Sequence, residues 1–336
     1  MLAGCMHKNG LPDNELFSRI HDIVAIANCS MLLFSLFIIL RSPKSKESKA
    51  YRYMAFSQYG VLFALSMIWS LVTKYNVDVK YGVAYTEGVL VFTNFNGGQV
   101  YVILIFIFGM FLVLLQTAYL FRLRVIAHQN HFVQNSRTFY GYIVVITVCL
   151  AICSPFTFLF AYVSDVTAEG NPISTFSQQE IEFLMSRRVI WYPYNRITSY
   201  PYFLSFGSSL VCTSLVLFYL SWEIVSEIKK KEITSSTTTL RYYKRVWVSL
   251  TIQTLGTLII MIPAPLAAFI ELVLPVNMCI TQTAVCFFGC CFGVNATLLL
   301  LLNANYRQTV TGLLIETAVS KTTSQFVKMK SRVNPH

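Results

Sequence analysis

Charged side chains are scarce in this chain. Asp, Glu, Lys and Arg make up 12% of its 336 residues, whereas 55% of the residues are hydrophobic. A soluble domain carries about 25% charged residues. Half that share provides too few charged side chains to cover the surface of a soluble domain of this size. The scarcity excludes an ordinary soluble protein and indicates a protein of the membrane.

Charge is almost absent from seven long apolar stretches. Each is close to the length of about 20 residues that a helix needs to cross a bilayer. Glu271 is the one Asp, Glu, Lys or Arg inside them. The alternating ten-residue segments of a membrane β-barrel are missing. The sequence therefore predicts an all-α membrane protein, a seven-transmembrane helix bundle with spans at Ile23–Leu40, Met54–Thr73, Gln99–Phe121, Gly141–Val163, Pro201–Ser221, Val246–Leu274 and Cys279–Leu302.

Lys and Arg are distributed very unevenly around these stretches. With the N-terminus outside, 19 of the 26 Lys and Arg residues fall on cytoplasmic segments and 7 on extracellular ones. Positive residues accumulate on the cytoplasmic side of membrane proteins. The first 16 residues lack the apolar core of a cleaved signal peptide. We therefore expect the N-terminus outside and the C-terminus in the cytoplasm.

This topology divides the chain into three parts. Residues 1–22 form an extracellular N-terminus, residues 23–302 the transmembrane domain, and residues 303–336 a cytoplasmic tail. The net charge of +11 follows from the topology and attracts anionic lipid of the inner leaflet. Basic residues are spread over four loops, so the charge does not predict nucleic-acid binding. Apolar residues at helical spacing predict a short amphipathic helix in the tail: Val310, Leu313, Leu314 and Ala318.

Cysteines are rare in the segments expected outside. The chain has nine, and seven of them lie within predicted helices, where a cysteine is usually a small apolar residue. Cys5 and Cys279 lie outside or at the outer rim, in a compartment that favours disulfides. A disulfide between them is compatible with the sequence, which gives no distance to test it.

Signatures of enzymes, metal sites and pores are missing. The chain has no G-x-S-x-G, no H-E-x-x-H and no phosphate-binding loop. His128 and His131 have ligand-like spacing but no third partner, so we expect a solvated loop without metal. No potassium-filter sequence or ring of acids indicates a pore. A carrier is disfavoured because the spans lack ionisable groups and internal repeats. No cofactor is predicted.

Neutral polar residues replace charges in the interior. Gln116, Gln253 and Asn295 are costly in hydrocarbon, so we expect them to point inward and to bond across the bundle. They either hold helices together or form part of a switch. Pro263 should bend the sixth helix, and a bent helix can swing at its inner end. Gly289 and Gly293 form a G-x-x-x-G step that lets the seventh helix approach a neighbour closely.

A ligand cavity, if present, should lie in the outer half of the bundle. Its candidate residues share helix faces by their spacing, and each is also compatible with plain core packing. An apolar, aromatic interior without a buried acid suits a small neutral molecule and does not suit an amine. The candidates are Tyr101, Ile105, Phe108, Ser205, Ser209 and Gln282.

Several short motifs resemble one receptor family. SPKS at 42–45 with YRYMAFSQ at 51–58 is similar to that family's first inner loop and second helix. LFRLR at 120–124 is similar to its third-helix end, where an acid usually stands at the position of Arg122. LTIQ at 250–253 and FGVNATLLLLLNANYRQ at 292–308 are similar to its last two helices, with Asn305 in place of a proline. Together these motifs resemble the nematode serpentine chemoreceptors, in particular class H of the Str superfamily.

The resemblance implies a chemosensory G-protein-coupled receptor, although the signature motifs of the rhodopsin-like class are missing. Such a receptor binds a small odorant or pheromone-like molecule and signals to a heterotrimeric G protein from the plasma membrane of a sensory cilium. Receptor oligomers are compatible with it. The residues that the resemblance implies at the G protein are Arg122, Arg124, Arg245, Tyr306 and Arg307.

Two alternatives remain open. Arg122 and Arg124 are also compatible with a plain role as interfacial anchors of the third helix. The chain as a whole is also compatible with a seven-helix ligand-gated ion channel of the odorant-receptor type. Such a channel has its N-terminus inside, which the distribution of Lys and Arg opposes.

Overall fold

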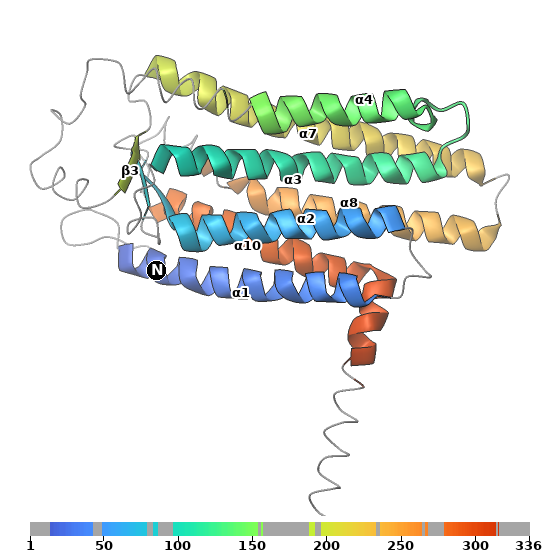
Figure 1. Ribbon diagram of the computed structural model, residues 1–336, viewed down its shortest axis with the longest axis horizontal. Coiled ribbons are helices and arrows are strands. Elements are labelled where there is room, and N and C mark those ends of the chain that lie inside the picture. Colours follow the sequence, from blue (N-terminus) through green and yellow to red (C-terminus); the bar gives the residue numbers. More distant parts are fainter. Residues whose placement is uncertain are drawn as a thin grey trace, which may run out of the picture.

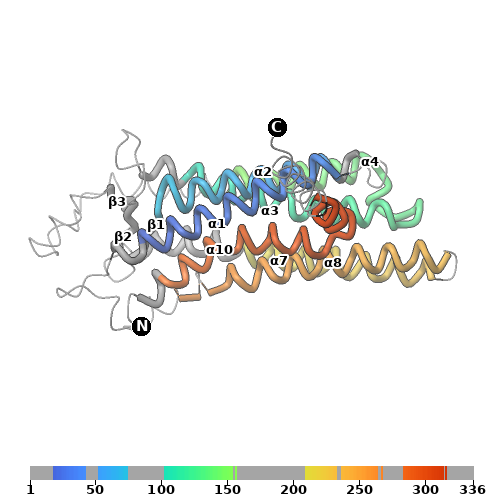
Figure 2. Tube along the Cα trace, turned by 90° about the horizontal axis from the view of Figure 1, so that it is seen from below, coloured from blue at the N-terminus to red at the C-terminus, as the bar shows by residue number. Residues whose placement is uncertain are grey.

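Seven long helices lie side by side in the described part of the chain (Figure 1). The computed structural model describes residues 14–42, 49–78, 83–86, 97–153, 156, 188–191, 196–232, 236–263, 266–267, 279–313 and 315. In the view turned by 90° from Figure 1, the first four helices lie mainly in one layer and the last three in another (Figure 2). The seven-helix, all-α membrane architecture expected from the sequence is therefore confirmed. The side of the membrane that each terminus occupies stays a prediction.

Each predicted span lies at least in part on one of these helices; residues 154–155 and 157–163 of the fourth span and 264–265 and 268–274 of the sixth lie outside the described residues. Two of them, α2 and α4, continue directly into π-helical turns. The helices are α1 Asn14–Arg41, α2 Lys49–Met67 with η2 Ile68–Thr73, α3 Gly97–Ile126, α4 Ser136–Thr147 with η5 Val148–Cys153, α7 Arg196–Lys231, α8 Thr237–Met261 and α10 Cys279–Leu302. A 3-10 turn, η4 Phe132–Gln134, precedes α4.

Six of the helices are long and apolar enough to cross a membrane by length and composition. The seventh, α8, begins with a polar and basic stretch. Its apolar part runs from Val246 to Met261, where the described helix ends, short of the about 20 residues of a full span. In contrast, α7 has 36 residues, about 54 Å at 1.5 Å per residue. It is therefore much longer than the about 30 Å of a bilayer core, and at the end away from the sheet it projects together with α8 beyond the other helices (Figure 1).

A small antiparallel sheet covers one end of the bundle, which we call the sheet end. It consists of β1 Tyr75–Asp78, β2 Val83–Thr86 and β3 Arg188–Trp191 in the order β1-β2-β3. Tyr75 pairs with Thr86, and Val83 pairs with Trp191. Strands were not expected here, because segments of four residues are too short to show an alternating pattern in the sequence. The opposite end, where the tail leaves the bundle, is called the tail end.

Lys74 turns the chain from η2 into the sheet. Its backbone has a positive φ of 40°, a conformation that few residues with a side chain adopt. Its ammonium lies 2.7 Å from the Asp22 carboxylate and donates to the Ser18 hydroxyl at 3.0 Å. Both partners belong to α1, so these contacts fix the turn against the first helix.

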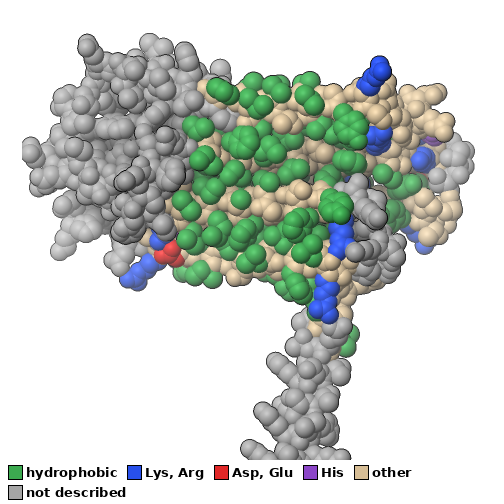
Figure 3. Space-filling view, in the orientation of Figure 1, with side chains coloured by type: hydrophobic (Ala, Val, Ile, Leu, Met, Phe, Trp, Pro, Cys, Tyr) green, Lys and Arg blue, Asp and Glu red, His purple; other side chains and the backbone are tan. Residues whose placement is uncertain are grey.

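The centre of the bundle is α3. Within its most apolar segment 67% of the residues are buried, against 22% for the corresponding segments of α4 and α7. Large apolar side chains on the outside of the bundle are exposed, including Phe218 at 72% and Trp222 at 66%. They spread along the helices between the two ends (Figure 3). A surface this apolar would be a liability in water and is the surface that lipid requires.

Short polar residues start the helices at the tail end. The Asn135 side chain accepts a hydrogen bond from the Arg137 backbone N–H at 3.0 Å, which caps α4. Ser236 caps α8 by accepting from the Thr239 N–H at 3.3 Å. Asn303 accepts from the Asn305 N–H at 3.0 Å, and residues 304–313 are helical. Side chains of this kind satisfy the free N–H groups of a first helical turn.

The tail helix at residues 304–313 turns away from the axis of α10 (Figure 1). Val310 and Leu313, two of the residues that predicted it, pack against the core of the bundle. Leu314 and Ala318 lie outside the described residues. The expected helix is present in this range, and its position on a membrane surface stays a prediction.

Candidate functional site

Aromatic rings from three elements meet in the half of the bundle near the sheet end. The Trp69 and Phe288 ring centroids are 4.8 Å apart, and the Phe108 and Phe288 centroids are 5.9 Å apart. Phe111 and Phe292 extend the group, with centroids 6.3 Å from Phe108 and 6.0 Å from Phe288. All five side chains are buried. We call these residues of η2, α3 and α10 the aromatic cluster.

The aromatic cluster contains one of the predicted ligand residues, Phe108. Ile105 lies about one turn nearer the sheet end on α3 and is also buried. Ser209 is half-buried on α7. The backbones of the other three candidates lie in α3, α7 and α10, but their side chains are outside the described residues: Tyr101, Ser205 and Gln282. Whether all six side chains converge therefore stays a prediction.

The predicted disulfide also lies beyond what the structure describes. Cys5 belongs to residues 1–13, and Cys279 starts α10 with a side chain that is not described. The pairing of these two cysteines stays a prediction.

Two π-helical turns flank α3 near the sheet end. In η2, the Thr73 hydroxyl donates to the backbone carbonyls of Ile68 and Trp69 at 2.9 and 2.8 Å. At η5 the backbone comes so close to α3 that a Cβ on Gly109 would lie 2.3 Å from the Leu150 carbonyl oxygen. Such turns are rare in proteins overall, but those that occur often lie at functional sites. These turns could not be predicted, because a single π turn leaves no periodic signal in the sequence.

Neutral polar side chains form a network deeper in the bundle. Tyr59 of α2 donates to the Asn295 side-chain oxygen at 2.8 Å. Gln253 of α8 donates to Tyr59 and, at 3.2 Å, to the same Asn295 oxygen. The Asn295 amide of α10 donates to the Thr257 hydroxyl at 2.6 Å. All four side chains are buried. We call these four residues the central network, and it joins α2, α8 and α10.

Two further bonds connect α3 to its neighbours. Gln116 donates to the Thr213 hydroxyl of α7 at 3.2 Å. Tyr119 donates to the Thr254 hydroxyl of α8 at 3.1 Å. The expectation that Gln116, Gln253 and Asn295 bond across the bundle is thus confirmed. The two tyrosines were not predicted as members of these contacts, because a tyrosine in an apolar helix resembles an ordinary core residue.

The predicted G-x-x-x-G step faces α1. The Asn28 amide of α1 donates to the Gly289 carbonyl at 2.8 Å. A Cβ on Gly293 would lie 2.3 Å from the Asn28 side-chain oxygen. A Cβ on Gly293 would therefore force Asn28 of α1 to move, whereas a Cβ on Gly289 would meet Val24 and Trp69 at ordinary contact distances of 3.5 and 3.6 Å.

Pro263 coincides with an interruption of the sixth helix. The regular helix α8 ends at Met261, a turn follows at Ile262, and Pro263 is again helical and exposed. Proline has no N–H to donate and clashes with the preceding turn. The location agrees with the expected bend, whereas the role of the bend as a switch stays a prediction.

Four of the predicted G-protein-facing residues are at least partly accessible at the tail end. Arg245 and Arg307 are exposed, and Arg122 and Arg124 are half-buried. The Arg124 guanidinium lies 4.6 Å from the centroid of Phe139. It also donates to the Ser136 hydroxyl at 3.0 Å. This arginine therefore connects α3 to the start of α4 in addition to presenting charge.

Tyr306 differs from the expectation. Its side chain is 0% exposed, so in this conformation a partner at the tail end cannot touch it. The physical reason is that the first turns of the tail helix pack against the core of the bundle through Val310 and Leu313. The ring of Tyr306 becomes part of the core between the tail helix and the bundle.

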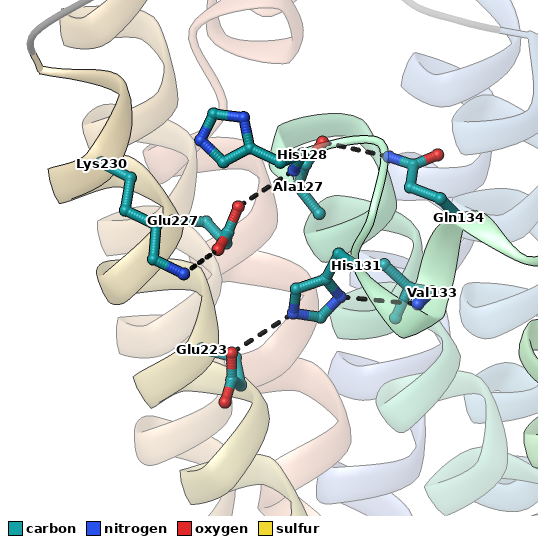
Figure 4. Close-up of polar contacts among 8 residues, drawn as sticks. All are labelled: Ala127, His128, His131, Val133, Gln134, Glu223, Glu227 and Lys230. Carbon is teal, nitrogen blue, oxygen red and sulfur yellow. Dashed lines mark hydrogen bonds and ion pairs between the residues drawn. The ribbon is translucent and has the colours of Figure 1, made fainter.

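Two glutamates of α7 hold the loop between α3 and α4 (Figure 4). Glu227 accepts from the His128 backbone N–H at 3.0 Å and from the Lys230 ammonium at 2.6 Å. The His131 Nε2 lies 3.3 Å from a Glu223 carboxylate oxygen. We call these five residues the loop clamp. The expectation of a solvated loop is wrong for His131, whose side chain is 12% exposed and has a partner 92 residues away.

The sequence signal for the loop clamp was weak. Glu223 and Glu227 are four residues apart and share one face of a helix, but their distant partners are not visible in the sequence. No group of three or more His, Cys, Asp or Glu residues suited to a metal ion occurs within the described ranges.

Charged and aromatic contacts also join α7 to α8 beyond the apolar spans. Lys244 forms an ion pair with Glu232, and its hydrogen bond holds the pKa of the Glu232 carboxyl below its usual value. The Lys231 ammonium lies 5.6 Å from the Tyr243 ring centroid. Trp247 donates to the Ser221 hydroxyl at 3.0 Å. The projecting ends of α7 and α8 therefore form one connected unit.

Comparisons with known proteins agree with this arrangement. The family model for the serpentine type 7TM GPCR chemoreceptor Srh matches residues 12–316. A crystal structure of squid rhodopsin has the same fold, with a TM-score of 0.59 over 93% of this chain and 90% of that chain. Its sequence identity is 12%, so this likeness concerns the fold alone. Among curated proteins no sequence matches the chain.

Proposed function

Because the chain belongs to the Srh family of serpentine seven-transmembrane chemoreceptors, we propose that it detects a small neutral molecule and signals to a heterotrimeric G protein. The ligand would bind near the sheet end, which we place outside the cell. The G protein would bind at the tail end, in the cytoplasm. The family and the rhodopsin-like fold support a receptor of the GPCR type in a multi-pass membrane protein. We further propose the plasma membrane of a sensory cilium as its location.

The charge of the interior supports a neutral ligand. Among the side chains that the structure describes, Glu227 is the one fully buried carboxylate, and it lies at the tail end. No described Lys, Arg or Asp is fully buried. A cationic ligand would require a buried acid to compensate its desolvation. The aromatic cluster offers apolar surface instead, which favours an uncharged, partly apolar molecule.

One face of α10 carries the proposal. Phe288, Phe292 and Asn295 follow one another at spacings of four and three residues, so they share that face. The aromatic cluster and the central network therefore share one helix, α10. A ligand that contacts the cluster would bias the position of α10, and with it the hydrogen bonds from Asn295 to α2 and α8.

The response would be a shift between two arrangements of the bundle. A ligand changes such a balance only as far as its affinities for the two arrangements differ. Movement of α8 would break the bonds of Gln253 and Thr257 to Asn295 and shift the basic residues at the tail end. Arg245 and Arg307 are exposed there. They suit an acidic surface on a partner or lipid headgroups.

The first experiment determines the topology. Small epitope tags at each terminus are detected on intact and then on permeabilised cells. The expected result is an N-terminus that antibodies reach on intact cells and a C-terminus that they reach only after permeabilisation. An N-terminus inside would contradict the proposal and favour the ligand-gated channel.

The second experiment tests signalling. Cells that express the chain are exposed to a panel of small neutral volatile molecules. A G-protein dissociation reporter in these cells measures activation. We expect at least one molecule to activate the reporter in a dose-dependent way and amines to be inactive. Ligand-evoked currents without any G-protein response would overturn the proposal.

A further inference from the structure

The loop between α3 and α4 is pressed against α7 by contacts of an uncommon kind. Most of the bundle is held by apolar packing and neutral hydrogen bonds, whereas the loop clamp uses two carboxylates. Figure 4 shows Glu223 and Glu227 on neighbouring turns of α7, both directed at the loop. The loop follows the third helix directly, at the position where we propose that a G protein binds.

Glu227 is the structural half of the loop clamp. Its side chain is 1% exposed, and each of its two oxygens has a partner. One oxygen accepts from the His128 backbone N–H, so the contact does not depend on the side chain of that residue. A buried carboxylate is tolerated only when it is paired and hydrogen-bonded. Loss of the contact with the loop would leave the Glu227 carboxylate without one of its two partners. The buried charge therefore favours the position of the loop against α7.

His131 is the other half of the loop clamp, and both of its ring nitrogens have partners. Its Nδ1 accepts from the Val133 N–H at 3.4 Å, which leaves Nε2 as the nitrogen that carries the proton. That Nε2 faces Glu223 at 3.3 Å. Protonation at Nδ1 would convert a neutral hydrogen bond to Glu223 into an ion pair, and it would remove the long contact with Val133, because a protonated Nδ1 cannot accept. Charge-assisted hydrogen bonds are about twice as strong as neutral ones, so the gain exceeds the loss.

The charged surroundings favour this direction. On α7, Glu223 and Glu227 both attract a protonated His131, and Lys230 already pairs with Glu227. Tyr219 of the same helix interacts with Glu223 and carries no positive charge.

Two basic groups on neighbouring elements complete the surroundings. Arg124 of α3 is engaged with Ser136 and Phe139. His128 of the loop is exposed.

We propose that Glu223 and Glu227 are positioning residues that hold the α3–α4 loop against α7, and that protonation of His131 tightens this hold. Histidine is the side chain that ordinarily titrates between pH 5 and 8. The loop would therefore be held more firmly as the cytoplasm acidifies. The consequence for coupling rests on the proposed function, whereas the proton-dependent hold itself needs neither ligand nor G protein.

The test uses amide hydrogen exchange on the full-length chain in lipid nanodiscs, without ligand or G protein. Exchange of peptides that cover residues 127–135 is measured between pH 7.5 and 5.5 and corrected for the known pH dependence of intrinsic exchange. We expect the corrected rate to fall about three- to tenfold on acidification, the range of a partly buried ion pair. His131→Gln and Glu223→Gln should abolish this pH dependence, because each keeps a hydrogen-bonding group and removes the charge pair.

A matched control lies in the same loop. His128→Gln removes a histidine whose ring is exposed and leaves its backbone contact to Glu227 in place, so its response to pH should equal that of the wild type. A flat wild-type profile, or a response that His131→Gln retains, would overturn the proposal.

Each variant is first compared with the wild type by its melting temperature at pH 7.5. His131→Gln lies in the loop and Glu223→Gln on α7, and each tests the pH dependence by itself. If one of these variants fails to fold, the other still decides the result. A failure of this test would leave the ligand and G-protein experiments unaffected.

Discussion

The two ends of the molecule are held together by different chemistry. Near the sheet end, described side chains meet mainly through aromatic rings, close backbone approach and neutral hydrogen bonds, as at Phe108 and Gly109, although the Lys74–Asp22 ion pair also lies there. At the tail end, ion pairs and cation–π contacts join the elements, as at Glu227 and Arg124. Neutral packing responds to shape, whereas charge pairs respond to pH, salt and charged partners. The difference suits a molecule that senses a neutral compound at one end and meets a regulated partner at the other.

The largest effect should come from disturbing the close approach near the sheet end. Gly109→Ala places a Cβ 2.3 Å from the Leu150 backbone oxygen, so α3 or η5 must shift. We expect a loss of about 3 kcal/mol in the free energy of unfolding, at the upper range for overpacking. The measurement is the melting temperature of the purified chain.

Gly60→Ala is the matched control for that substitution. A Cβ on Gly60 meets nothing within 4 Å, and alanine favours a helix by about 1 kcal/mol over glycine. Its melting temperature should stay the same or rise. Equal losses for the two variants would show that close packing at Gly109 has no special weight.

A smaller loss should follow from breaking the central network. Asn295→Val removes the side-chain partner of Tyr59, Gln253 and Thr257. Buried polar groups without partners cost about 1–3 kcal/mol, so both stability and the balance between receptor states should change. The measurements are the melting temperature and the basal activity of a G-protein reporter. Thr297→Val serves as control, because the Thr297 hydroxyl bonds to Gly293 of its own helix.

A change in basal activity would assign the central network to the switch. An altered melting temperature with unchanged basal activity would assign it to packing instead. These two outcomes correspond to the two roles that the sequence left open for Gln253 and Asn295.

The aromatic cluster can be tested for ligand contact with a pair of phenylalanines on α3. Phe108 is 4% exposed, whereas Phe106 is 44% exposed on the outside of the bundle. Phe108→Ala should reduce the potency of an activating ligand about tenfold, the effect of losing one aromatic contact. Phe106→Ala should leave the potency unchanged. A dose–response series with a G-protein reporter measures both, and equal potencies would move the ligand away from the cluster.

The overall architecture could be predicted from the sequence because it follows from local patterns. Seven long apolar stretches with a single charged residue among them, Glu271, predict seven helices by composition alone. Neutral polar residues such as Gln116 and Asn295 had to find partners inside the bundle, since lipid offers none. Both features depend on what each segment contains, and the sequence shows that directly.

The remaining features depend on which distant segments meet. The pairing of His131 with Glu223 spans 92 residues, and each residue alone looks like part of a solvated surface. Tyr306 was expected at the surface, and the packing of the tail helix buries it. Strands of four residues and single π turns leave no periodic signal. Tertiary contacts thus decided the outcome wherever the local pattern was short or polar.

The smallest effect should come from an exposed ion pair at the tail end. Glu232 and Lys244 join α7 to α8, and both side chains are about half exposed. The hydrogen bond from Lys244 lowers the pKa of Glu232 in the folded chain. A carboxyl with a lowered folded pKa stabilises the fold above its unfolded pKa, and this contribution disappears as the pH falls through the folded value.

Solvent screens such an exposed pair, so Glu232→Gln should change the melting temperature at pH 7 very little. Glu227→Gln should lower it clearly, because the Glu227 side chain is 1% exposed and holds the loop. Melting curves of the two variants and the wild type at low and high salt make the measurement. If Glu232→Gln were as damaging as Glu227→Gln, the projecting ends of α7 and α8 would depend on surface charge and not on the buried carboxylate. The tail end would then respond to salt throughout, and its response to pH would no longer be specific to the loop clamp.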